Sequence, residues 1–148
     1  MNNKQKNSLE FTEPVIEQYS DNVVLEVMQQ KISDDVAAKY VLIKHDYYSS
    51  DSDHGRDLLR SFFNVLVNSD IKNLIIYLTD SGTRLLDENN PLHNDFYPLI
   101  TKSEIVIADD ESITNYEVTC TTDSKISIKS FDSIAEDIIF RSDFLILE

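Results

Sequence analysis

Apolar runs alternate with polar, turn-rich segments along most of the chain, and this pattern predicts its strands and helices. Residues 71–86 show it most plainly, because the apolar run at 74–78 ends abruptly in the polar sequence Thr-Asp-Ser-Gly at 79–82. A short apolar run rich in isoleucine is typical of a strand buried on both faces, as in a parallel sheet. Gly82 permits either a positive φ or a close approach of another group to its backbone. We therefore predict a central strand that opens into a tight polar turn.

The same pattern predicts further strands and the helices between them. Strands are expected at residues 40–43, 104–108, 125–129 and 144–147, and the alternation within 125–129 indicates a more exposed position. Helices are expected at residues 55–68, 92–102, 113–118 and 133–141. The first helix has the clearest apolar stripe, which consists of Leu58, Leu59, Phe62, Phe63, Leu66 and Val67.

Three local signals concern the helix ends. Asp53 is the predicted N-cap of the first helix, because its carboxylate can accept hydrogen bonds from the first-turn amides. Ser133 and Glu136 have the spacing of a capping box at the start of the last helix. Pro98 must lie in the first turn of its helix or break it, because proline has no amide hydrogen to donate.

Strands and helices alternate from residue 39 onward, which implies right-handed crossovers. The predicted fold is therefore a three-layer α/β domain at residues 39–148 with a mainly parallel, five-stranded sheet. Residues 1–38 are expected to form an N-terminal arm that is partly extended. Within this arm, residues 22–28 contain a short apolar run that predicts either an edge strand or a helical turn.

Composition excludes several classes of function. The chain has 148 residues, 13 Lys and Arg against 27 Asp and Glu, and a net charge of −14, which argues against nucleic acid and anionic membranes as partners. The charge is expected to keep the protein soluble, and a basic protein partner stays open. The single cysteine, Cys120, forms no intramolecular disulfide. No signal peptide or membrane-spanning run is visible, so a cytoplasmic location is expected.

Three segments carry a family resemblance. Residues 49–66 have a polar loop, then a glycine that opens a helix; residues 74–86 have a strand followed by DSGTRL; and residues 103–118 have a strand, a polar turn and a short helix. In this order the segments resemble the DsrE-like superfamily, most closely the C-terminal domain of YedF-type proteins of sulfur and selenium metabolism. The resemblance runs from about residue 40 to the C-terminus. It implies a DsrE-like fold and self-association, because relatives commonly form oligomers.

The third segment departs from the family where its chemistry would lie. The family has a Cys-Gly-Thr-Cys-Leu turn there, and this chain has Ala-Asp-Asp-Glu-Ser at residues 108–112. Thiolate chemistry at this turn is impossible without a cysteine. We therefore predict a non-catalytic binding or assembly subunit that works without a cofactor. A sulfur-transfer protein that uses Cys120 is the alternative, although an ordinary small residue is the simpler interpretation of this cysteine.

The candidate site residues gather where the predicted strands end, which is where open α/β sheets build their sites. Ligand-binding or interface candidates are Tyr47, Tyr48, Asp80, Ser81, Gly82, Asp109, Asp110 and Ser112. The two tyrosines pack over the sheet edge or serve an interface. A cation or small ligand held by the acidic loops is a third hypothesis, with His45, Asp51, Asp53 and His54 as its weak metal candidates. Solvated acidic loops are the simpler interpretation, because His54 stands where an EF-hand requires glycine.

Overall fold

The computed structural model describes residues 38–141 and 143–148. Residues 1–37 of the predicted N-terminal arm, with the edge strand or helical turn expected at residues 22–28, therefore fall outside the described residues.

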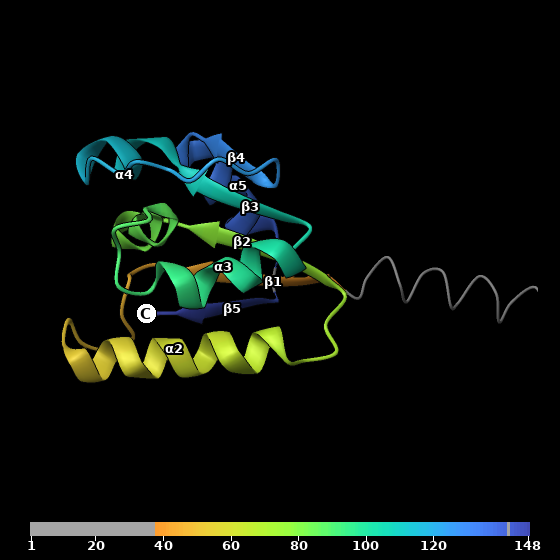
Figure 1. The fold of residues 1–148 in the computed structure, drawn as a ribbon. Helices are drawn as coiled ribbons and strands as arrows, with labels where there is room; N and C mark the ends of the chain where they lie inside the picture. Colours follow the sequence, from red (N-terminus) through yellow and green to blue (C-terminus); the bar gives the residue numbers. More distant parts are fainter. Residues whose placement is uncertain (1–37, 142) are drawn as a thin grey trace, which may run out of the picture. The chain divides into compact units, whose positions relative to one another are not determined.

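Helices and strands alternate through the described chain (Figure 1). The strands are β1 (Ala38–Ile43), β2 (Asn73–Leu78), β3 (Ile105–Asp109), β4 (Ile126–Lys129) and β5 (Phe144–Leu147). The helices are α2 (Asp53–Val67), the 3-10 helix η2 (Asp80–Leu86), α3 (His93–Lys102), α4 (Asp110–Asn115) and α5 (Phe131–Phe140). All neighbouring strands pair in parallel, in the order β4-β3-β2-β1-β5. The predicted α/β fold with a parallel, five-stranded sheet is confirmed.

Strand β2 occupies the centre of the sheet and is buried on both faces. It pairs with β1 along its whole length, from Ala38 opposite Asn73 to Ile43 opposite Leu78, and with β3 on its other side. Its alternate side chains enter two separate apolar clusters. This double burial explains why the strand reads as a continuous apolar run rather than an alternating one.

The helices form layers on the two faces of the sheet. Helices α2 and α3 cover one face, where Phe63 and Phe96 are fully buried and their ring centroids lie 5.3 Å apart. Figure 1 shows these two helices together on that side. Helix α5 packs on the opposite face through Ile134. The hydroxyl of Tyr77 donates a 2.5 Å hydrogen bond to Asp137 of α5, and burial together with this carboxylate raises the pKa of Tyr77.

Two predicted helix caps, those of α2 and α5, were wrong by one to three residues. Ser52, not Asp53, caps α2, because its hydroxyl accepts the amide hydrogen of Gly55 at 3.0 Å. Helix α5 begins after Ser130, whose hydroxyl accepts from the amide of Ser133. In both cases several hydroxyl or carboxylate residues compete for one cap, and the direction in which the chain enters the helix selects among them.

The other two corrections concern α3 and α4. Pro98 lies inside α3, beyond its first turn, and the helix continues to Lys102. Burial of Phe96, Leu99 and Ile100 holds the helix in spite of the missing amide hydrogen. Helix α4 begins at Asp110, three residues before the predicted start, because the Asp109 carboxylate accepts the amide hydrogen of Glu111 at 3.1 Å. No helix in the described part of the chain is both long and apolar enough to cross a membrane.

Candidate functional site

The loops after β1 and β2 meet in very close backbone contact. The amide of Gly82 donates to Lys44 O at 3.2 Å, and the amide of Thr79 donates to Ile43 O at the same distance. A Cβ at position 82 would lie 2.3 Å from Ile43 O. Gly82 is thus required for close approach, and its φ is not positive; it is Asp80 that takes the left-handed conformation, with φ 50°. Of the two roles that the sequence allows for Gly82, the structure uses the second.

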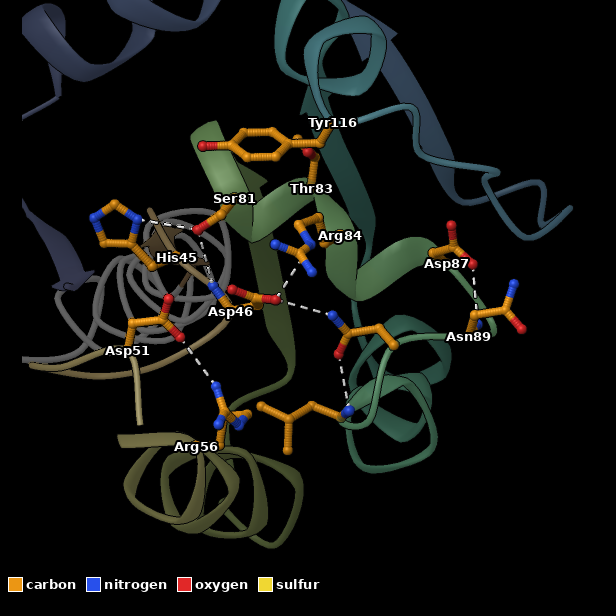
Figure 2. A network of polar contacts seen from close by, with 12 residues as sticks. His45, Asp46, Asp51, Arg56, Ser81, Thr83, Arg84, Asp87, Asn89 and Tyr116 are labelled. Atoms are coloured by element: carbon orange, nitrogen blue, oxygen red, sulfur yellow. Dashed lines mark hydrogen bonds and ion pairs between the residues drawn. The ribbon is translucent and has the colours of Figure 1, made fainter. Parts of the chain in front are cut away.

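His45, Asp80 and Ser81 come together at this edge, but they do not form a catalytic relay. His45 Nδ1 lies 3.1 Å from Ser81 Oγ, and Figure 2 shows the two side chains side by side. The same nitrogen lies 3.3 Å from Asp80 Oδ2. In a serine–histidine–aspartate relay the serine and the carboxylate occupy opposite ring nitrogens. Here both contact the same nitrogen, so His45 cannot accept a proton from Ser81 while Asp80 orients it. The three side chains therefore contact one another without activating Ser81 as a nucleophile.

Helix α4, which directly follows β3, joins the same network through Ser112. Its hydroxyl donates to Asp109 at 2.5 Å and accepts the amide hydrogen of Asp80 at 2.9 Å. The hydroxyl of Tyr116 donates to Asp80 Oδ1 at 2.7 Å, and this bond is the main cause of the raised pKa of Tyr116. Asp110 is exposed in the first turn of α4. Sequence reasoning missed Tyr116, because its partner Asp80 is far from it along the chain.

The two tyrosines after β1 contact different neighbours. Tyr47 stacks on His45, with ring centroids 4.8 Å apart and planes within 2° of parallel. Tyr48 packs against Phe62 of α2 at 4.9 Å and contacts the larger apolar cluster. Both side chains are half-buried. From these contacts, Tyr48 packs against α2, whereas Tyr47 lies beside His45 among the polar side chains at the end of the sheet.

The acidic residues of the first loop are held by arginine. Arg56 binds Asp51 at 3.1 Å and Asp53 at 2.9 Å, and His54 is exposed. Within residues 38–141 and 143–148, no group of three or more His, Cys, Asp or Glu side chains is placed to hold a metal ion. The carboxylates that the cation hypothesis needs are therefore turned towards a neighbouring guanidinium.

Arg84 stands between two hollows that sequence reasoning missed. It is half-exposed on η2, and its Nε lies 3.5 Å from the nearly buried carboxylate of Asp46. Figure 2 shows Arg84 beside Asp46. The Asp46 carboxylate also accepts from Asn90 Nδ2 at 3.0 Å. A pocket of about 390 Å³ lies between η2 and the end of α4, and one of about 420 Å³ faces α2; Arg84 and Pro91 line both. The only sequence signal was the place of Arg84 within the DSGTRL sequence that carries part of the family resemblance.

Cys120 lies beside the end of η2. It forms an antiparallel bridge with Asp87, and the amide of Thr121 next to it donates to Leu86 O at 2.8 Å. Burial, with a contribution from the Asp87 charge, raises the pKa of the Cys120 thiol. Asp87 itself accepts the amides of Asn89 and Thr119 at 2.9 and 3.0 Å, and these bonds lower its pKa. A reactive thiolate requires the opposite environment, one that stabilises negative charge on sulfur.

Comparisons with known proteins add a structural likeness. No protein-family model matches the chain, and no curated protein matches it in sequence. Among solved structures, the crystal structure of the YchN protein from E. coli matches with a TM-score of 0.48 and 14% sequence identity. The match covers 74% of this chain and 99% of that chain. At this identity the likeness concerns the fold, and it assigns no activity, ligand or partner.

Proposed function

We propose that this chain is a DsrE-like protein that acts as a non-catalytic binding or assembly subunit and carries no sulfur or selenium covalently. The order of the three sequence segments supports the family, and the parallel sheet agrees with it. The observation that carries the proposal is the turn after β3. There the carboxylate of Asp109 caps α4, and Ser112 is hydrogen-bonded to Asp109 and to the amide of Asp80.

Ser112 is a poor replacement for a thiol at this turn. A serine nucleophile needs a base that removes its proton, and an alkoxide here would form beside the carboxylates of Asp109, Asp110 and Glu111. The imidazole of His45 hydrogen-bonds to Ser81 instead of Ser112. The charged and hydroxyl groups of this turn are held in fixed positions, so the turn is suited to binding and not to covalent chemistry.

Sulfur loading of the full chain tests the proposal. Incubation with an inorganic polysulfide or with selenite, followed by intact-protein mass spectrometry, is expected to leave the mass of the protein unchanged. The raised pKa of Cys120 supports this expectation, because the neutral thiol is a weak nucleophile. Cys120→Ser is the matched control.

A stoichiometric sulfur or selenium adduct would overturn the proposal. If that adduct disappears in Cys120→Ser, the sulfur-transfer alternative takes its place. The assembly part is tested by sedimentation velocity, in which we expect a single species heavier than the 17.0 kDa monomer. A monomer throughout the micromolar range would remove self-association and leave only ligand binding.

A further inference from the structure

The pocket between η2 and the end of α4 has charged, polar and apolar residues in its lining. Its volume of about 390 Å³ falls within the range of roughly 300–1,000 Å³ that holds small molecules. Arg84 supplies one positive charge, and Asp87 and Glu117 supply two negative charges. Pro91 and Val118 add apolar surface to the same lining. The occupant must therefore satisfy both signs of charge and present an apolar part.

The guanidinium of Arg84 has hydrogen-bond donors that are available to a ligand. Its Nε faces Asp46 at 3.5 Å, which is long for a charged hydrogen bond. Within the described part of the chain, its terminal Nη atoms have no hydrogen-bond partner, and the guanidinium carbon lies 5.8 Å from the centre of the Tyr116 ring. The planar fork of an arginine matches the two oxygens of a carboxylate. A ligand carboxylate can thus bind Arg84 without displacing an internal ion pair of good geometry.

The carboxylate of Asp87 supplies the pocket with a negative charge that is fixed in position and ionised. Two backbone amides, those of Asn89 and Thr119, hold its two oxygens at 2.9 and 3.0 Å and lower its pKa. Each carboxylate oxygen has a second lone pair that such a bond leaves open. An ammonium group in the pocket would find this charge already in place, without reorganisation of the loop.

Glu117 lines the pocket at a position where glycine would be more stable. Helix α4 ends in a Schellman motif, in which the amide of Val118 donates to Ile113 O at 2.9 Å and the amide of Glu117 donates to Thr114 O at 3.2 Å. Glu117 takes the left-handed conformation of this motif with φ 53°. That conformation disfavours any residue with a Cβ. Glu117 therefore lines the pocket at a cost in local stability.

We propose that this pocket binds a free α-amino acid with an apolar side chain. Arg84 takes the carboxylate, Asp87 and Glu117 take the ammonium group, and Pro91 and Val118 contact the side chain. A phosphate would meet two carboxylates against one arginine, and a divalent cation would meet the arginine. This inference rests on the proposed function in one respect: both treat the chain as a binding protein. The two are tested separately, because sulfur loading of Cys120 and amino-acid binding are different measurements.

Titration of the isotopically labelled full chain with L-leucine, L-methionine and L-phenylalanine tests the proposal. We expect at least one of them to shift the amide resonances of Asn89 and Val118 in a saturable way below about 10 mM. Its N-acetyl and its amide derivatives should each bind at least about tenfold more weakly, because each lacks one charge.

Variants separate this pocket from its surroundings. Arg84→Met should weaken binding at least about tenfold, and Arg56→Met is the matched control, because Arg56 lines only the neighbouring hollow. Glu117→Gly should weaken binding while it raises the melting temperature, a combination that damage to the fold cannot produce. The proposal is overturned if no amino acid saturates, if a blocked derivative binds equally well, or if both Arg84→Met and Glu117→Gly leave the affinity unchanged. A sulfur adduct on Cys120 would overturn the proposed function and leave these affinities as they are.

Discussion

Replacing Gly82 with alanine tests the backbone contact on which the candidate site is built. The added Cβ would lie 2.3 Å from Ile43 O and 3.1 Å from Ile43 C, whereas real Cβ atoms essentially never come within 3.0 Å of another heavy atom. The two segments must therefore separate by about 0.7 Å or more. Both contacting atoms belong to the backbone, so no side-chain rotamer can relieve the clash.

The cost of this separation follows from the contacts that it strains. Overpacking costs about 1–3 kcal/mol. Hydrogen bonds from Thr79 N to Ile43 O and from Gly82 N to Lys44 O, each 3.2 Å long, weaken as the segments move apart. Each such bond contributes about 1 kcal/mol, so Gly82→Ala should lower the free energy of unfolding by roughly 2–4 kcal/mol in total. For a domain of about 100 residues this corresponds to a fall in Tm of roughly 10–25 °C.

Urea unfolding of the full chain, followed by far-UV circular dichroism, measures the effect. The m-value should stay unchanged, so that the whole difference appears in the midpoint. Asn64→Ala on the exposed side of α2 is the control and should change the free energy of unfolding by less than about 0.5 kcal/mol. A loss below about 1 kcal/mol for Gly82→Ala, at constant m, would show that η2 does not lie against β1 as described.

Three further predictions concern caps and charges. Ser52→Ala should cost about 1 kcal/mol of stability and Asp53→Ala less than about 0.5 kcal/mol, and equal losses in urea unfolding would contradict Ser52 as the cap of α2. Glu117→Gly should raise the free energy of unfolding by about 0.5–1 kcal/mol, since glycine takes φ 53° without strain; a lower Tm would refute this. Because the pKa of Asp87 is lowered in the folded state, its contribution is present above about pH 4 and is lost as the pH falls through the folded pKa. Asp87→Asn should therefore be less stable than the native chain at pH 7 and approach it in acid, and a pH-independent difference would exclude the charge as the cause.

Much of the architecture follows from the sequence alone. An apolar run such as 74–78, ended by polar residues, is typical of a strand that is buried on both faces of a parallel sheet, and its pattern predicts both the strand and its central position. The stripe on residues 58–67 likewise determines which side of α2 meets the core. The absence of cysteine from residues 108–112 is also a fact of the sequence, and it limits the chemistry of that turn before any coordinates are known.

The polar detail was decided by tertiary structure. Serine and aspartate occur close together at the starts of α2, α4 and α5, and only the path of the chain selects Ser52 for α2 and Asp109 for α4. Pairings such as Tyr116 with Asp80 join residues on different loops, and no local pattern records them.

Arg84 shows the same limit at the candidate site. Its charge is visible in the sequence, but its place between two hollows depends on how η2 packs beside the loops that follow β1 and α4. The periodicity of buried residues is a local property and can be seen in the sequence. Hydrogen bonds and pockets depend on distances between residues far apart in the chain, and only the assembled sheet defines these distances.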